Sequence, residues 1–350
     1  MNGMILFIGA LFLLWVGRSI LIPLLVATFF WYLINAISTY YRKVLPYNAN
    51  EARSKYFWKA KSMDFISQLL SFLTLCGVIY FFITQVRPMF TELFLYLPEL
   101  QHKIINFSNY LYNSIGLKFD ASMIPNLTNI AANVGASVAN IATSTGMILI
   151  YMLFMFIEQS TFNRKFASLF PNKSKSKKIR YIIESIDTNM KKYLFMKTLI
   201  SGITGILSYF LLELLGLEFA GVWAFIVFIT SYIPTIGAII ACALPILFSL
   251  VTAPSLQQPI LTAIGLIALQ IIFGNILEPK LTGKTLNLST LAILINLVFW
   301  GMIWGIAGMF FSVPLLVATF IITAQFDSTR WVAVLLSADG KIPNKNEDEE

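Results

Sequence analysis

Five stretches of this chain carry no charged residue, and each is long enough to cross a lipid bilayer. They span residues 19–41, 65–86, 121–157, 219–277 and 285–326. The hydrocarbon core of a bilayer requires about 20 apolar residues in one helix. Because no water is present there to bind the backbone, each segment must satisfy its own backbone groups, which favours helices over isolated strands. Only 12% of the residues are charged, about half the share in soluble domains, so we expect an all-α polytopic membrane protein.

The basic residues indicate which side of the membrane each loop occupies. Segment 42–61 is strongly basic, and segment 158–198 holds ten basic residues against three acidic ones. Segment 87–140 balances three basic residues with three acidic residues. Short loops rich in lysine and arginine stay in the cytoplasm. We therefore expect both basic segments and both termini to be cytoplasmic, and 87–140 to lie outside the membrane.

These features predict a five-part organisation. The parts are N-terminal transmembrane helices at 1–86 with a basic cytoplasmic loop at 42–61, an extracytoplasmic region at 87–140, a transmembrane helix and basic cytoplasmic loop at 141–197, a C-terminal transmembrane permease core at 198–326, and a cytoplasmic tail at 327–350. Apolar residues at helical spacing predict amphipathic helices in the extracytoplasmic region. Its many small residues suit close packing between subunits, and an interfacial cover on the protein's own surface is an equal alternative.

Two long apolar windows in the C-terminal half, 219–252 and 289–325, are interrupted near the middle. The interruptions are SYIPTIGAIIACALP (231–245) and FWGMIWGIAGMFFSVP (299–314). The residues expected to shape them are Pro234, Gly237 and Pro245 in the first, and Gly301, Gly305, Gly308 and Pro314 in the second. Paired, interrupted segments are the pattern of repeat-built secondary transporters, and the alternative is two kinked or paired helices with ordinary packing glycines. The chain has about eight spans if each window is one bent helix and about ten if each is a hairpin.

A short charged segment, GNILEPKLTGKTLNLS (274–289), lies between apolar stretches. Pro279 breaks or starts a helix and Gly283 permits a left-handed turn, so we expect Glu278 and Lys280 on an irregular stretch. A glutamate at a membrane must be paired, hydrated or protonated, and Lys280 and Lys284 are nearby partners. This arrangement suits either a proton- or cation-linked switch or a water-facing loop that ends two helices.

Residue 278 is not the glycine that a phosphate-binding loop ending in GKT requires, so we expect no ATP hydrolysis by this chain.

Other chemistry-bearing residues are sparse. Cys76 and Cys242 lie in apolar windows and suit packing, and His102 has no companion ligands. We therefore expect no metal, no cofactor and no enzymatic activity. The basic segment 158–198 lacks interleaved aromatic residues, so we expect it to face anionic lipid rather than nucleic acid.

Several motifs resemble the autoinducer-2 exporter family of bacterial inner-membrane permeases. The resemblance is strongest for the charged segment with LAILINLVFWGMIWGIAGMFFSVPLL after it, and extends to SYIPTIGAIIACALP, LLELLGLEFAGVWAF (211–225) and IPLLVATFFWYLINAIS (22–38). Thr290 stands where proline is expected after the serine. The resemblance implies a homo-oligomeric permease that exports a small polar molecule, with sodium or lithium exchange for protons in other members. Carried over by motif, the transport and coupling positions are Asn275, Glu278, Lys280 and Lys284, beside Pro279 and Gly283.

Three functions remain open at this stage. The first is a secondary exporter of a small hydrophilic solute such as autoinducer-2, and the second is a Na⁺(Li⁺)/H⁺ antiporter. The third is a membrane scaffold without transport. Gln270 and Asn296 are polar residues inside apolar spans, and each favours a packing hydrogen bond over a substrate contact.

Overall fold

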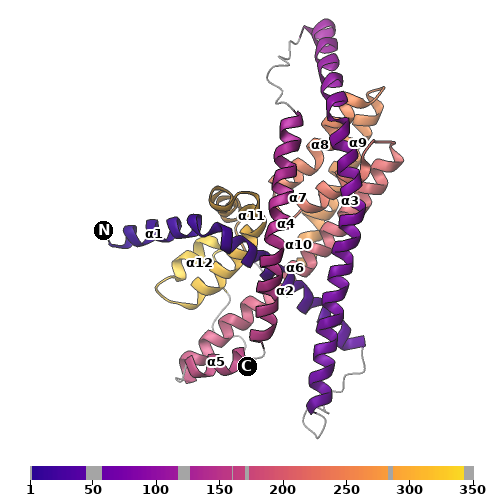
Figure 1. The fold of residues 1–350 in the computed structure, drawn as a ribbon. Helices are drawn as coiled ribbons and strands as arrows, with labels where there is room; N and C mark the ends of the chain where they lie inside the picture. The colour runs from indigo at the N-terminus through magenta and orange to yellow at the C-terminus, as the bar shows by residue number, and fades with distance from the viewer. Residues whose placement is uncertain are drawn as a thin grey trace. The chain divides into compact units, whose positions relative to one another are not determined.

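The computed structural model describes residues 2–44, 57–116, 127–159, 161–169, 173–282 and 287–342, and every regular element within those ranges is a helix (Figure 1). In chain order these are α1 (Asn2–Val16), α2 (Arg18–Val44), α3 (Phe57–Ile115), α4 (Leu127–Gln159), α5 (Phe162–Leu169), α6 (Lys173–Leu214), α7 (Ala220–Thr230), α8 (Ile236–Thr252), α9 (Gln257–Leu269), the π-helix η3 (Gln270–Leu277), α10 (Glu278–Thr282), α11 (Thr290–Gln325) and α12 (Arg330–Leu336).

The residues gather into two compact units, each assembled from separate parts of the chain. Unit 1 comprises Met1–Cys76, Ser144–Lys197 and Lys280–Glu350, and unit 2 comprises Gly77–Thr143 and Thr198–Pro279. Helices α3, α4 and α6 each contribute residues to both units. The boundary between the units therefore falls inside these helices. Neither unit is one continuous segment of the chain.

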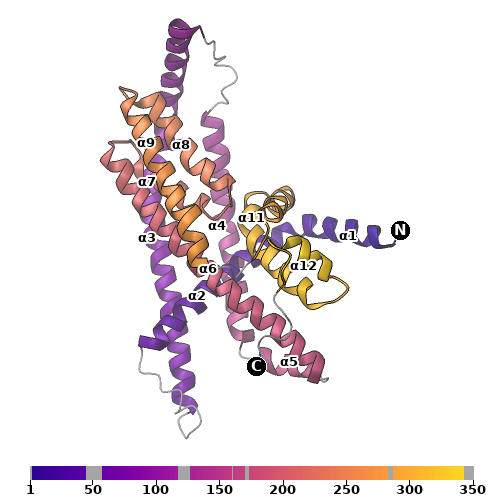
Figure 2. The same cartoon turned by 180° about the vertical axis from the view of Figure 1, so that it is seen from behind.

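Aromatic packing forms the core of unit 2, where α7, α8 and α9 lie side by side in both views (Figures 1 and 2). The Trp223 and Phe219 rings lie 5.1 and 5.9 Å from the Phe248 ring. Leu93 of α3 and Leu212 of α6 are buried in the same cluster. Gly216, with φ +66°, ends α6, and the Leu217 amide donates to the Leu212 carbonyl over 2.9 Å. This glycine ending is common because only glycine adopts the left-handed conformation without strain.

Unit 1 is built around α2 and α11. The Phe29 ring of α2 lies 5.4 Å from Phe310 and 6.2 Å from Phe311 of α11. Helix α12 packs on α11, and an isolated antiparallel bridge pairs Leu288 with Ser337. A turn at Gly17 separates α1 from α2.

The helices confirm the expected class of an all-α polytopic membrane protein. By length and composition, five described helices can cross a membrane, and three shorter apolar helices span Ser144–Gln159, Ala220–Thr230 and Ile236–Thr252. Helix α3 runs through the charge-free window 65–86 and continues to Ile115, with Pro88 and Pro98 inside it. Its 59 residues rise by about 90 Å, so α3 extends well beyond a hydrocarbon core of about 30 Å.

Candidate functional site

The first interrupted segment forms a helical hairpin in unit 2. Helix α7 ends at Thr230, a short turn follows, and α8 begins at Ile236. At the tip, the Ile236 amide donates to the Pro234 carbonyl over 2.6 Å, and Thr235 between them has φ +60° and ψ −61°. These values describe a γ-turn with positive φ, which is rare and strained for a residue with a side chain. The hairpin therefore stores backbone strain at its tip.

Gly237 allows the two arms of this hairpin to meet. A Cβ at Gly237 would overlap the Thr230 carbonyl oxygen and lie 3.3 Å from the Ile233 Cβ. Only glycine therefore fits at position 237 as long as the turn between α7 and α8 keeps this conformation. Pro245 lies buried inside α8, so the expectation that it helps to break the segment is wrong. The physical reason is that a helix tolerates proline where neighbouring groups compensate for the missing hydrogen bond.

Helix α6 anchors the first hairpin within unit 2. The Tyr232 hydroxyl at the tip donates to Thr198 Oγ1 over 2.9 Å. Further along α6, a Cβ at Gly205 would lie 3.0 Å from the Phe228 Cβ and 3.3 Å from the Ala224 oxygen. The contacts pair increasing positions on α6 with decreasing positions on α7, so the two helices run antiparallel.

The second interrupted segment forms a hairpin inside α11. Gly305 has φ +64° and ψ −141°, a conformation open essentially to glycine alone, and the helix folds back there. A Cβ at Gly308 would overlap the Trp300 carbonyl oxygen. A Cβ at Gly301 would lie 3.0 Å from the Met309 Cε, and Pro314 lies inside the returning arm without breaking it.

Asn296 joins the two arms of the α11 hairpin. Its Nδ2 donates to the Ser312 carbonyl over 2.6 Å, and its Oδ1 accepts from Trp300 Nε1 over 3.1 Å. At the tip, Trp304 Nε1 donates to the Leu14 carbonyl in the last turn of α1 over 3.0 Å. The final carbonyls of a helix lack intrahelical partners, so the end of α1 provides an acceptor for the hairpin tip.

The charged segment is more regular than expected. The Glu278 amide donates to the Phe273 carbonyl, five residues earlier, which closes the π-helix η3. Pro279 then occupies the second position of α10 and contributes no backbone N–H to it. Glu278 and Lys280 therefore lie in a helix, and the expectation of an irregular stretch is wrong for them. Glu278 is half-buried, and Asn275 and Lys280 are exposed.

Three further predicted positions are Gly283 and Lys284 in this segment and Gln270 just before it. Gly283 and Lys284 lie outside the described residues. Gln270 begins η3, and its Oε1 lies 3.5 Å from the position of a Cβ on Gly274. Glu278 follows the eight-residue π-helix η3 directly, and π-helices are rare in proteins.

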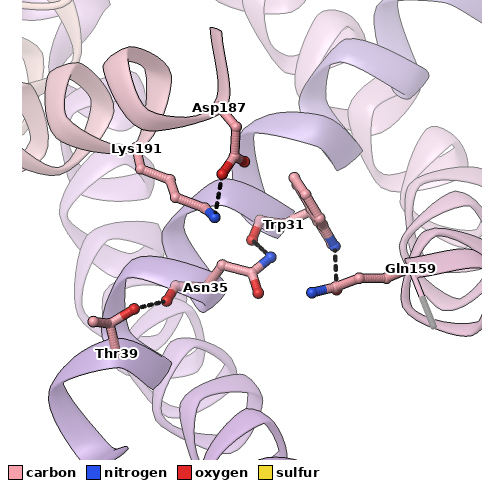
Figure 3. Close-up of polar contacts among 6 residues, drawn as sticks. All are labelled: Trp31, Asn35, Thr39, Gln159, Asp187 and Lys191. Carbon is pink, nitrogen blue, oxygen red and sulfur yellow. Dashed lines mark hydrogen bonds and ion pairs between the residues drawn. The ribbon is translucent and has the colours of Figure 1, made fainter. Parts of the chain in front are cut away.

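A polar cluster in unit 1 joins α2, α4 and α6 (Figure 3). Trp31 Nε1 donates to Gln159 Oε1 over 3.2 Å, and Lys191 Nζ lies 2.6 Å from Asp187 Oδ2 and 5.9 Å from the centre of the Trp31 ring. Asn35 donates to the Trp31 carbonyl over 2.9 Å. From the sequence, residues 22–38 were given as a family motif, and none of these side chains was singled out. The recurrence of Trp31, Asn35 and Thr39 every four residues was the available signal.

A clasp of hydrogen bonds holds the start of α11 to the chain after α12. Asn287 Nδ2 donates to Asp339 Oδ1 over 2.7 Å and to the Lys341 carbonyl over 2.9 Å. The Ser289 amide donates to the Leu336 carbonyl. The hydrogen bond from Asn287 and a further one from the Lys341 amide lower the pKa of Asp339 below its ordinary value. Asn287 follows the charged segment and was missed because an exposed asparagine carries no sequence signal of its partner.

The model of the AI-2E family transporters matches residues 4–328 of this chain. This match spans both hairpins, the charged segment and the polar cluster. The chain belongs to the AI-2E family. Among the part of the chain that the structure describes, no three His, Cys, Asp or Glu residues gather as a metal-binding group.

Individual AI-2E relatives differ in how far the similarity extends. The chain is 34% identical to the AI-2 transport protein TqsA of Escherichia coli over 205 residues, which cover 59% of this chain and 58% of that protein. A Haemophilus influenzae protein, whose name says only that it is a transport protein, is 34% identical over 62% of both chains. The Bacillus subtilis transport protein YueF is 22% identical over 85% of this chain and 81% of its own length. The chain thus aligns with less than two thirds of the first two relatives.

Proposed function

We propose that this chain is a secondary membrane transporter that exports a small hydrophilic solute such as autoinducer-2, without ATP hydrolysis of its own. The observation that carries the proposal is the pair of helical hairpins at Pro234 and Gly305, both in apolar segments. A helix that breaks at membrane depth releases backbone donors and acceptors, which suit the binding of ions and polar solutes. The printed name of the Escherichia coli relative supports autoinducer-2 as the first solute to test.

In this proposal Glu278 is the coupling carboxylate. It lies half-buried in the candidate span Gln257–Leu281, directly after the π-helix. A carboxyl group at membrane depth is costly unless it is paired, hydrated or protonated. Its protonation is therefore a natural step to couple with solute movement, with Lys280 and Lys284 as candidate partners on the chain that follows.

A Na⁺(Li⁺)/H⁺ antiporter is the second candidate, and the position of Glu278 favours it. The same carboxylate would bind a monovalent cation or a proton alternately.

Under both proposals the chain is a homo-oligomer in the bacterial inner membrane. The five-part organisation, with cytoplasmic termini and 87–140 outside, is retained as part of the proposal.

Flux into proteoliposomes tests the function. Purified wild-type protein is compared with Glu278→Gln, using autoinducer-2, sodium and lithium, with and without a proton gradient. We expect gradient-dependent movement of autoinducer-2 that Glu278→Gln abolishes. Glu218→Gln is the matched control because Glu218 is an exposed acid in the turn between α6 and α7.

Each other result has a distinct meaning. Cation–proton exchange lost in Glu278→Gln, without movement of autoinducer-2, would establish the antiporter instead. If correctly folded protein moves none of these species, the chain acts as a membrane scaffold toward them and the exporter proposal is wrong.

A further inference from the structure

An ion pair on α6 lies against a charge-free stretch of α2. Lys191 Nζ lies 2.6 Å from Asp187 Oδ2, one turn earlier on α6, and 5.9 Å from the centre of the Trp31 ring on α2 (Figure 3). All three residues belong to unit 1. Helix α2 is a candidate span from Arg18 to Arg42, and every residue between these two arginines is uncharged. Two charged side chains thus meet a stretch that carries no charge of its own.

The depth of this contact makes the charges costly. Trp31 lies near the middle of the candidate span, about 20 Å from Arg18 and about 17 Å from Arg42 along the helix axis. In a helix that crosses the bilayer this is the hydrocarbon core, where an ionisable side chain needs a partner and marks a functional site by default. An apolar pair of similar volume would fill the same place without removing two charges from water. The ion pair therefore points to a function that requires charge.

The Trp31 ring is held in place beside this pair. Trp31 Nε1 donates to Gln159 Oε1 of α4 over 3.2 Å, and the Asn35 amide donates to the Trp31 carbonyl over 2.9 Å. The Asp187 and Lys191 side chains are 34% and 35% exposed, so neither is sealed inside the protein. A carboxylate and the face of an indole ring both attract cations. The cluster therefore has the chemistry of a cation site.

Lys191 is a built-in cation for the Asp187 carboxylate, and it is held weakly. Ion pairs at this spacing on one helix are among the weaker ones, and a cation over an aromatic ring adds a modest further attraction. Together these contacts keep the pair closed for about nine-tenths of the time. A free cation requires no vacant space, because the ammonium group already occupies the place and its flexible stem lets it swing away.

A similar cluster on α3 shows why the setting matters more than the pair itself. Lys103 Nζ lies 3.3 Å from Glu99 Oε1 and 5.1 Å from the centre of the Tyr96 ring, and it donates to the Tyr96 hydroxyl over 2.6 Å. All three residues belong to one helix, and the Glu99 side chain is 60% exposed. The ring beside Lys191 instead comes from a second helix that is uncharged around it. This setting distinguishes Asp187 from the carboxylate of an ordinary surface pair.

We propose that Asp187 is a binding site for a small monovalent cation, and that the Lys191 ammonium group is the tethered occupant which this cation displaces. The incoming ion takes the place of the ammonium group between the carboxylate and the Trp31 ring. Displacement also ends the contact of Lys191 with Trp31, which removes a link between α6 and α2. The inference rests on the proposed transport function, and it gives a coupling cation a place in unit 1, whereas Glu278 belongs to unit 2.

Melting of the purified protein in lipid nanodiscs tests the site. Sodium chloride and lithium chloride are the probes, and N-methyl-D-glucamine chloride at equal ionic strength is the blank. We expect sodium or lithium to raise the melting temperature of the wild-type protein, since a ligand stabilises the state that binds it. Lys191→Met should reach the same rise at about one-tenth of the cation concentration, because the closed pair no longer competes. The double variant Asp187→Asn/Lys191→Met, which leaves neither charge unpaired, should lose this gain in affinity.

Lys192→Met is the matched control. Lys192 is the exposed neighbour of Lys191 on α6, so this variant removes the same charge without freeing Asp187. We expect it to respond to sodium and lithium as the wild type does. Equal cation affinity in the wild type and Lys191→Met would overturn the site. An equal gain in Lys192→Met would assign the effect to net charge, and a gain that persists in the double variant would exclude Asp187, so either result also overturns the site.

A parallel flux measurement separates this inference from the proposed function. If autoinducer-2 or a cation crosses the membrane of proteoliposomes while Lys191→Met binds sodium and lithium no more tightly than the wild type, the site is wrong and the transport proposal stands. If Lys191→Met shows the gain in affinity but correctly folded protein moves no solute, the site stands and the transport proposal is wrong.

Discussion

The two helical hairpins close in the same way but are held by different forces. In each, a glycine on the returning arm approaches a carbonyl of the first arm: Gly237 meets Thr230, and Gly308 meets Trp300. The α7–α8 hairpin rests on an aromatic core around Phe248. The α11 hairpin instead joins its own arms through the Asn296 side chain. Both hairpins thus bring a glycine of the returning arm against a carbonyl of the first arm. The contacts that hold the two arms together differ between the hairpins.

The tips differ in where they place backbone strain. Gly305 takes the unusual conformation of the α11 tip, so glycine absorbs it without cost. In the α7–α8 tip a threonine takes it, at a cost in stability. The first hairpin therefore holds backbone strain at its tip that the second does not.

Adding a methyl group to either closing glycine should have the largest effect. Gly237→Ala and Gly308→Ala would each drive a Cβ into a backbone carbonyl, which cannot move aside as a side chain can. We expect each variant to lose on the order of 4 kcal/mol of stability or more, measured as thermal melting of the purified protein. In Gly202→Ala the new Cβ meets nothing within 4 Å, so this control should gain about 0.5–1 kcal/mol. Melting equal to that control would show that the close approach is unnecessary.

Exchanging the strained residues should produce effects of opposite sign. Gly305→Thr should cost about 1–3 kcal/mol because threonine has a Cβ that disfavours this backbone conformation. Thr235→Gly should stabilise the protein by about 1 kcal/mol, after the entropy cost of glycine is subtracted. Melting temperatures of the two variants and of the double exchange measure this. Two shifts of the same sign would refute the assignment of strain to the first tip.

The polar contacts of the two hairpins should differ in importance. Asn296→Leu removes the partner of both the Ser312 carbonyl and Trp300 Nε1, so we expect a loss of about 1–2 kcal/mol. Tyr232→Phe removes one hydrogen bond to Thr198, and should cost about 0.6 kcal/mol. Thr319→Val is the control, since its exposed hydroxyl binds only its own helix. A larger loss in Tyr232→Phe than in Asn296→Leu would reverse the proposed contrast.

The clasp at the base of the α11 hairpin should give a small acid dependence. Hydrogen bonds lower the pKa of Asp339 in the folded protein. The clasp therefore contributes its stability above the ordinary pKa of an aspartate, and this contribution is lost as the pH falls through the lowered value. Asn287→Ala removes the largest cause of the lowered pKa, so this variant should lose less stability than the wild type when the pH falls. Limited proteolysis after α12 between about pH 6 and pH 3 measures it, with exposed Asn275→Ala as the control. Identical profiles in all three proteins would contradict the role of Asn287.

Periodicity and composition predicted much of the fold because a membrane permits few alternatives. The charge-free windows indicated apolar helices, and the glycine–proline breaks were located to within a few residues. The roles of Pro245 and Pro314 were predicted wrongly, because proline removes one hydrogen bond without necessarily ending a helix. Glu278 was singled out by its charge in an apolar context. Its helical setting was missed, because the π-helix depends on backbone pairing that leaves no sequence pattern.

What the sequence determined by itself is the class of molecule, the existence of two interrupted segments and the family. These properties follow from residue types and local spacing, which require no knowledge of partners. Only the tertiary structure decided that both interruptions are hairpins, that Asn296 joins two arms, and that Ser201 and Ser208 are buried without partners in the described chain. The physical reason is that these properties depend on contacts between residues up to tens of positions apart, and a serine in a helix has the same local sequence signature whether or not a partner faces it.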